Sequence, residues 1–143
     1  MRKDLLREAV QLLHEGGHTC VIRDDAFLFT SCLRGVRPLV ELVQAQTLPG
    51  GCVAADKVVG KATAWLYVLL EVSALYADVI SEPALTVLRE REIPVEYGIC
   101  VPNIINRRGD GICPFEETVM PINDPQKAHA AILQKMKDMG IAE

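Results

Sequence analysis

Apolar residues at the start of the chain recur with the spacing of an amphipathic helix. Between residues 2 and 15 they occupy positions 5, 6, 9, 10, 12 and 13, which lie on one face of a helix. The pair Gly16-Gly17 follows directly and ends the pattern. Residues 18–31 then contain two short apolar runs separated by Asp24-Asp25, and this arrangement predicts a β-hairpin.

From residue 37 onward, segments of helical length alternate with short apolar segments that are typical of buried strands. The predicted helices cover 37–46, 56–71, 81–93 and 123–140, and the irregular segment 102–117 ends in a short helix. The predicted strands cover 51–55, 74–81 and 94–101. Prolines near the helix starts at 38, 83 and 125 support these boundaries, because proline is well tolerated in a first helical turn.

The order of these elements predicts an α/β protein. The hairpin supplies an antiparallel edge, and the single strands that alternate with helices form a parallel portion of the same sheet. We therefore expect a three-layer α/β/α sandwich with a mixed five-stranded sheet. The chain shows no internal repeat, linker or low-complexity segment, so residues 1–143 are expected to form a single domain.

Composition and charge exclude several classes of protein. The chain has 143 residues, 50% hydrophobic and 24% charged, and a formal net charge of -4, which argues against a nucleic-acid-binding protein. Its five cysteines are odd in number and include no C-x-x-C pair, so a disulfide framework is not expected. The first residues do not resemble a signal peptide, and the longest apolar run, Ala62 to Leu70, is too short to span a membrane. We expect a cytoplasmic protein with reduced thiols and no membrane contact.

Residues 56–61 place charges inside an otherwise apolar region. Asp56 is expected to cap the helix that follows the 51–55 strand, because an acid is favoured near exposed helix N–H groups. Lys57 and Lys61 are four residues apart and would share one helix face, with Gly60 between them allowing a close approach. Two interpretations stay open: the lysines extend from a buried helix into solvent, or they line a pocket at the carboxyl ends of the strands.

The segment 102–117 is the richest in polar side chains. Pro114 suits the first turn of a helix, which places Cys113 at the N-cap, where a thiol can become a nucleophile. The glycines at 109 and 111 would let backbone N–H groups face an anion. The alternative is a surface loop with an inert cysteine. The sequence assigns no base to Cys113, and neither the other cysteines nor the three histidines form a recognised metal pattern.

Several short motifs resemble the cytidine deaminase-like superfamily. "VISEP" is similar to the end of the strand that carries the second motif of that superfamily, and "AADKVVGKA" falls on its first motif. Together with "NRRGDGICPFEE", these segments resemble an uncharacterised bacterial family, a domain of unknown function assigned to the same superfamily. The resemblance implies a cytidine deaminase-like fold. Relatives in the superfamily often form dimers or tetramers, so the resemblance also makes a homo-oligomer plausible.

The resemblance does not extend to the zinc site. Zinc deaminases need three ligands, one His or Cys and two Cys, and a glutamate that shuttles protons. The corresponding positions here hold Ala54, Ala84, Val87 and, in place of the glutamate, Asp56. We therefore expect no zinc-dependent deaminase activity, no metal and no cofactor.

The preferred hypothesis is a zinc-free binding module for a nucleotide or a related anionic small molecule. Lysine and arginine would hold phosphate groups and the acids would hold hydroxyl groups. The expected ligand-binding residues are Lys57, Lys61, Ser81, Glu82, Asn103, Asn106 and Arg107, beside Asp56. Two alternatives stay open: a metal-free enzyme that uses Asp56 as general base or Cys113 as nucleophile, and a non-catalytic oligomeric interaction protein.

Overall fold

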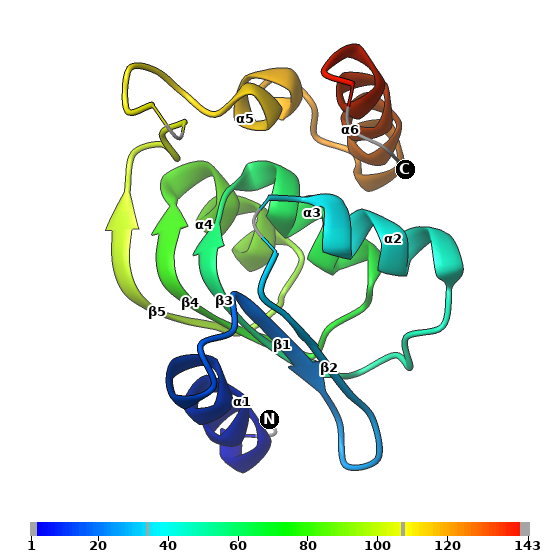
Figure 1. Cartoon of the computed structure of the whole chain (residues 1–143), viewed down its shortest axis with the longest axis vertical. Coiled ribbons are helices and arrows are strands. Elements are labelled where there is room, and N and C mark those ends of the chain that lie inside the picture. The colour runs from blue at the N-terminus through cyan, green and yellow to red at the C-terminus, as the bar shows by residue number, and fades with distance from the viewer. Residues whose placement is uncertain (1–2, 34, 107, 141–143) are drawn as a thin grey trace.

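The computed structural model of the chain describes residues 3–33, 35–106 and 108–140. These residues form six helices and five strands, and the strands make one sheet (Figure 1). The helices are α1 (Lys3–Glu15), α2 (Arg37–Ala45), α3 (Lys61–Leu69), α4 (Glu82–Glu90), α5 (Pro114–Val119) and α6 (Pro125–Asp138). The strands are β1 (Cys20–Arg23), β2 (Leu28–Ser31), β3 (Val53–Val59), β4 (Ala74–Ser81) and β5 (Val95–Val101).

The sheet is mixed, and its strand order is β2-β1-β3-β4-β5. Strand β1 pairs antiparallel with both β2 and β3, whereas β3, β4 and β5 are parallel. The turn of the β1–β2 hairpin is closed by the Asp24 carboxyl, which accepts hydrogen bonds from the backbone N–H groups of Ala26 (2.8 Å) and Phe27 (2.6 Å). The predicted hairpin and mixed α/β sheet are therefore confirmed.

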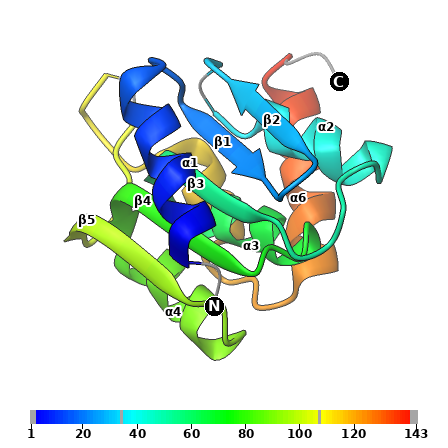
Figure 2. The ribbon, with the colours of Figure 1, turned by 90° about the horizontal axis from the view of Figure 1, so that it is seen from below.

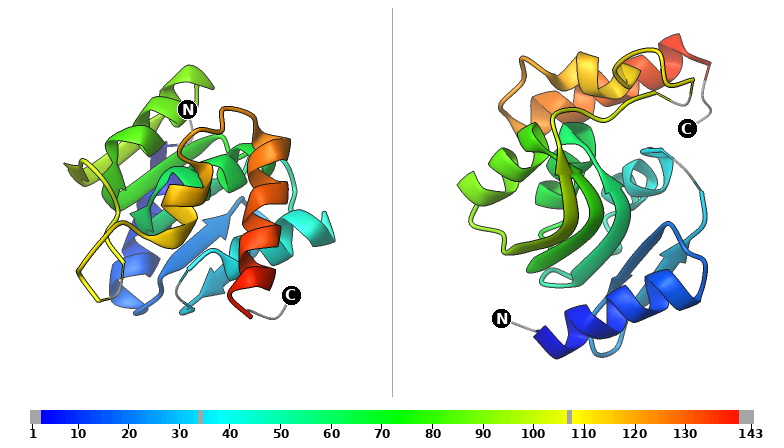
Figure 3. Two further views of the ribbon diagram at one scale, coloured as in Figure 1. Left: turned by 90° about the horizontal axis from the view of Figure 1, so that it is seen from above. Right: turned by 90° about the vertical axis from the view of Figure 1, so that its left-hand side faces the viewer.

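Helices cover both faces of the sheet. Helix α1 packs alone on one face, where Leu6 and Leu13 contact a buried cluster that includes Val21 and Val53 (Figure 2). Helices α2, α3 and α4 lie on the opposite face, over the larger part of the core. Helices α5 and α6 pack against α3 on the side away from the sheet (Figure 3). The three-layer sandwich thus carries an additional pair of helices above α3.

The boundary between β3 and α3 differs from the prediction. Strand β3 continues through Asp56 to Val59, and α3 begins only at Lys61, with Gly60 as its N-cap residue. Asp56 is held in the strand by pairing on both sides, opposite Cys20 of β1 and Ala77 of β4. Pairing between distant strands therefore overrides the local helix-start signal of an acid before an apolar segment. The prediction that Asp56 caps a helix is wrong.

The other predicted helix starts agree with the structure. The Ser81 hydroxyl caps α4 by accepting a hydrogen bond from the N–H of Ala84 (3.2 Å), and the Asp124 carboxyl caps α6 through the N–H of Lys127 (2.9 Å). Cys113 is the N-cap residue of α5. Among the described residues, no helix has the length and apolar character required to cross a membrane.

Candidate functional site

A cavity of about 890 Å³ lies beside the carboxyl end of β3. Its walls come from the ends of β3 and α6 and from the segments that precede α2 and α5. The apolar lining residues are Leu33, Val36, Pro38, Leu39, Val58, Ile104, Ile105, Pro114, Phe115, Met136 and Met139. The polar ones are Thr19, Cys20, Arg37, Asp56, Lys57, Thr63, Asn106, Arg108, Cys113 and Glu116. The carboxyl ends of strands are where open α/β sheets commonly bind ligands.

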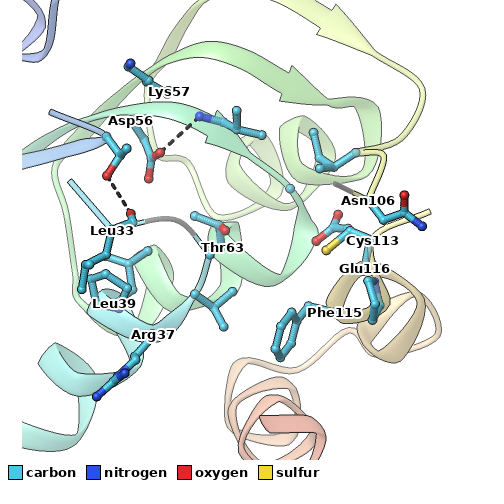
Figure 4. A pocket seen from close by; sticks show the side chains of 18 of the residues that line it. Leu33, Arg37, Leu39, Asp56, Lys57, Thr63, Asn106, Cys113, Phe115 and Glu116 are labelled. Carbon is cyan, nitrogen blue, oxygen red and sulfur yellow. Dashed lines mark hydrogen bonds between the residues drawn. The ribbon is translucent and has the colours of Figure 1, made fainter. Parts of the chain in front are cut away.

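Asp56 places a buried carboxyl group at the wall of this cavity. The residue is 9% exposed, and Figure 4 shows its carboxyl directed toward the cavity. Its oxygens accept hydrogen bonds from the hydroxyl of Tyr67 (2.6 Å) and the N–H of Val58 (3.2 Å). Burial raises the pKa of Asp56 from 3.8 to about 7, although the hydrogen bonds from Tyr67 and from the backbone oppose the rise. This carboxyl therefore exchanges its proton near neutral pH.

Tyr67 and Cys20 extend the polar contact of Asp56 into the core. The Tyr67 hydroxyl lies 3.2 Å from the Cys20 sulfur, and both residues are buried. Burial raises the pKa of both the Tyr67 hydroxyl and the Cys20 thiol, and the nearby Asp56 carboxyl acts in the same direction. Within this trio, Asp56 is therefore the group that changes charge near neutral pH, and Tyr67 fixes its orientation.

The N-terminus of α3 is occupied by the side chain of Glu116. Its carboxyl accepts hydrogen bonds from the backbone N–H groups of Lys61 (2.6 Å) and Ala62 (3.0 Å). Burial raises the pKa of Glu116, opposed by these two hydrogen bonds and by the charge of Lys61. Gly60 makes the contact possible, because a Cβ at this position would overlap the carboxyl. The close approach predicted at Gly60 is therefore real, although the residue lies at the helix start and not inside the helix.

Lys61 is engaged inside the protein and is not a lining residue of the cavity. Its ammonium group donates hydrogen bonds to the carbonyl of Met120 (2.8 Å) and to the side-chain oxygen of Asn123 (3.3 Å). Burial lowers the pKa of Lys61. Lys57 does line the cavity, but it belongs to β3 and its side chain points away from the interior (Figure 4). The predicted common helix face of Lys57 and Lys61 is wrong, because Lys57 lies in the strand.

Of the remaining predicted ligand-binding residues, one lines the cavity, three do not, and one is not described by the structure. Asn106 lines the cavity, and its side-chain oxygen accepts a hydrogen bond from the N–H of Gly109 (2.8 Å), which shapes the loop. Ser81, Glu82 and Asn103 lie outside the set of lining residues: Ser81 is the buried cap of α4, and Glu82 is exposed. Arg107 lies outside the described residues.

Cys113 lines the cavity at the start of α5 and is half-buried. No histidine is found among the described lining residues, so none of them offers the imidazole base that commonly activates a thiol. Cys113 can therefore contact a ligand in the cavity, but no histidine among the described lining residues is placed to act as its base. Asp56 is the stronger candidate for a reacting group, because its pKa is raised to about 7 and Tyr67 holds its carboxyl in place.

Several residues of the site were not predicted. They are Thr19, Cys20, Arg37, Thr63, Tyr67, Arg108 and Glu116. A sequence signal existed for Tyr67, because a tyrosine in an apolar helix needs a polar partner for its hydroxyl. Glu116 gave no such signal, since its partners are 54 and 55 residues away along the chain.

The positions assigned to the zinc motif do not form a cluster of ligands. Ala54 is buried inside β3, whereas Ala84 and Val87 lie in α4, and Asp56 is in mid-strand instead of at a helix start. Within residues 3–33, 35–106 and 108–140, no group of three or more His, Cys, Asp or Glu side chains is placed to hold a metal ion.

Comparison with known proteins relates the chain to one family. A family model described as "TM1506: Domain of unknown function (DUF1893)" matches residues 8–136. The crystal structure of a DUF1893 family protein, TM1506 from Thermotoga maritima, is similar with a TM-score of 0.87 and 30% sequence identity. The similarity covers 94% of this chain and 92% of that one. No curated protein matches the sequence. The wider resemblance to cytidine deaminases stays a prediction.

Proposed function

The chain belongs to the DUF1893 family, and from this premise we propose that it binds a nucleotide or a related small molecule in the cavity beside Asp56. One observation carries the proposal: a cavity of about 890 Å³ with mainly apolar walls has a buried carboxyl directed into it. Pockets for small ligands commonly combine apolar walls with a few polar groups that fix orientation.

The interior of the cavity suits the uncharged part of such a ligand. Phe115 and Leu39 offer apolar surface against which a flat ring can pack. The Asp56 carboxylate accepts hydrogen bonds, so it favours a ligand that presents N–H or O–H donors, as nucleobases and riboses do. The Thr63 hydroxyl, on the first turn of α3, adds a group that can donate or accept.

A phosphate group would lie at the mouth of the cavity. The interior disfavours an anion, because Asp56 is acidic and the Glu116 carboxyl already occupies the N-terminus of α3. Three cationic side chains are exposed at the rim, Lys57, Arg37 and Arg108. This arrangement revises the predicted site, because Lys61 is replaced as a phosphate partner by cations of the rim.

Thermal unfolding with matched nucleobases, nucleosides and nucleotides tests the proposal. A ligand present at about 100 times its dissociation constant adds about 2.7 kcal/mol to stability. For a domain of this size, that corresponds to a rise in melting temperature of roughly 5–15 °C. Asp56→Asn should weaken the effect, and Lys57→Ala should weaken it for nucleotides but not for nucleosides.

Glu82→Gln provides a matched control, because Glu82 was predicted as a ligand contact yet lies outside the cavity. This variant should bind like the wild type. Absence of stabilisation by every member of the series, or equal loss in the Glu82 and Asp56 variants, would refute the proposal.

A second candidate function is metal-free general base catalysis by Asp56. The observation that favours it is the pKa of about 7, which suits a group that accepts a proton near neutral pH. Tyr67 holds the carboxyl in place through its 2.6 Å hydrogen bond. If a stabilising ligand is also turned over, Asp56→Asn should abolish turnover while Cys113→Ser retains it. Loss of turnover in the Cys113 variant alone would instead identify the thiol as the reacting group.

A further inference from the structure

The outer edge of β5 is open in the described structure. β5 is the last strand of the sheet, and β4 is its neighbour on the inner side (Figure 1). Helix α1 lies beneath β1, β3 and β4 and leaves the face of β5 on that side uncovered (Figure 2). The residues from Glu96 to Cys100 are all exposed. An open edge of this kind can pair with another strand.

Two of the exposed residues of β5 are large and apolar. Tyr97 is 39% exposed and Ile99 is 57% exposed, and the two residues are separated by Gly98. Proteins usually protect an open edge with lysines, inward-pointing charges or a proline within the strand. Between Pro94 and Pro102, β5 carries one charged residue, Glu96. Apart from Glu96, the strand therefore carries none of these protections against pairing.

The backbone of β5 presents alternate residues to the open edge. The N–H of Leu75 in β4 donates to the carbonyl of Pro94 (3.0 Å), so Pro94 faces β4. The pairing register of β4 and β5 is constant along the strand, and backbone groups alternate in direction from one residue to the next. The residues whose backbone groups face outward are therefore Val95, Tyr97, Ile99 and Val101.

We propose that β5 pairs antiparallel with β5 of a second copy of this chain, about a two-fold axis at Gly98. This register places Tyr97 opposite Ile99 of the other copy and Val95 opposite Val101, so all four outward-facing residues are paired. Gly98 faces Gly98, where no side chains collide. A two-fold contact of this type is self-complementary, as the common dimers of soluble proteins are.

The strand sequence favours a second copy over an unrelated partner. In the segment "PVEYGICVP", the four outward-facing apolar residues and the two bounding prolines are placed symmetrically about Gly98. An axis at residue 97 or 99 would leave one of the four outward-facing residues without its counterpart inside β5. The axis at Gly98 also places Glu96 opposite Cys100, which keeps the two glutamates apart. The resulting dimer has one continuous sheet formed from both copies.

Sedimentation equilibrium of the full chain tests the proposal. We expect a dimer at micromolar concentration, and the double variant Tyr97→Lys/Ile99→Lys should raise the dissociation constant at least about tenfold by removing the cross-strand apolar pairs. Leu28→Lys is the matched control, because Leu28 is 56% exposed on β2 at the opposite edge of the sheet. A monomeric wild type, or a double variant that stays dimeric, would overturn the proposal, as would dissociation by Leu28→Lys.

A cross-link reports the register without weakening the edge. With the axis at Gly98, Glu96→Cys lies opposite Cys100 of the other copy, in a pair whose Cβ atoms are close enough for a disulfide. Mild oxidation of Glu96→Cys should give a covalent dimer on a non-reducing gel. The same variant with Cys100→Ser should not, and neither should Leu28→Cys. No cross-link with Cys100 present would exclude this register even if the lysine variant fails to fold.

Discussion

Replacing Asp56 with asparagine is expected to remove a large pH dependence from the stability of the protein. Asparagine has nearly the shape of aspartate but does not ionise. Its carbonyl oxygen can accept the hydrogen bond from the N–H of Val58, and its NH2 group can donate to the oxygen of the Tyr67 hydroxyl, which then acts as the acceptor. The buried carboxyl of Asp56 is 9% exposed, and its pKa is raised by burial from 3.8 to about 7. The unfolded and folded proteins therefore release this proton at different pH values.

The sign and size of the effect follow from that difference. Below pH 3.8, the carboxyl is neutral in both the folded and the unfolded protein, so burying it costs no ionisation energy and the free energy of unfolding has its full value. As the pH rises from there, the unfolded chain loses its proton first, and the free energy of unfolding falls by about 1.4 kcal/mol per pH unit. The fall ends as the pH passes about 7, where the folded protein also releases the proton. Between pH 5 and pH 8, the loss amounts to about 2–3 kcal/mol.

Urea unfolding at several pH values from 5 to 8 measures this quantity. The difference in unfolding free energy between Asp56→Asn and the wild type should shift by about 2–3 kcal/mol in favour of the variant across the range. Other titrating groups, Glu116 among them, are present in both proteins and cancel in the difference. Glu82→Gln, which removes an exposed carboxyl outside the cavity, is measured beside it as the matched control.

A constant difference between Asp56→Asn and the wild type would refute this reasoning. It would mean that the folded protein ionises Asp56 as readily as the unfolded chain does. The cavity would then solvate the carboxylate, and the interior of the proposed site would be polar instead of mainly apolar.

Three further predictions concern the start of α3 and the cap of α4, each measured by urea unfolding. Glu116→Gln should lower the free energy of unfolding by about 1–3 kcal/mol, because one buried backbone N–H loses its acceptor. Glu117→Gln, on the exposed side of α5, is the control and should change it little. Equal unfolding midpoints for the two variants would contradict the assigned contact. Gly60→Ala should lower the free energy of unfolding by about 1–3 kcal/mol, because the added methyl group forces the Glu116 carboxyl aside. Gly111→Ala is the control, since its Cβ would meet its nearest neighbour at 3.6 Å, an ordinary contact distance. A larger loss of stability in Gly111→Ala than in Gly60→Ala would disprove the close packing at Gly60. Ser81→Ala should cost about 1 kcal/mol through loss of the cap of α4, and an unchanged midpoint would show that the hydroxyl contributes nothing.

The parts of the fold that sequence reasoning predicted are those set by local signals. Helix α4 begins at a Ser-x-Pro pattern, and α6 begins at Asp124 before Pro125, so the residues around each start determine it. The prediction of the boundary between β3 and α3 was wrong, because this boundary depends on the pairing of residues 56–59 with strands elsewhere in the chain. A helix-like local pattern was overridden by contacts that a single sequence does not display.

In the candidate site, too, the sequence predicted the residues marked by local signals and missed those that depend on distant contacts. Asp56, Lys57, Asn106 and Cys113 were predicted and do line the cavity, because the ends of buried strands and glycine-rich loops are recognisable in a sequence. The role of Lys61 was missed, since its partners lie 59 and 62 residues further along the chain. The sequence analysis also did not predict that the cavity walls are mainly apolar. The apolar lining residues lie far apart along the chain and meet only in the folded structure: Leu33, Val36, Leu39, Ile104, Ile105, Met136 and Met139.

The contact between Glu116 and α3 has a consequence for folding during synthesis. Glu116 is synthesised 55 residues after Lys61. The backbone N–H groups of Lys61 and Ala62 therefore lack the Glu116 carboxyl as acceptor while those residues are added. At about 5–20 residues per second, the delay is roughly 3–11 s. During that interval a nascent chain exposes the side of α3 against which α6 later packs. Packing of this side of α3 therefore waits for α6, and a ribosome that stalls before α6 would hold a chain open to chaperones and proteases.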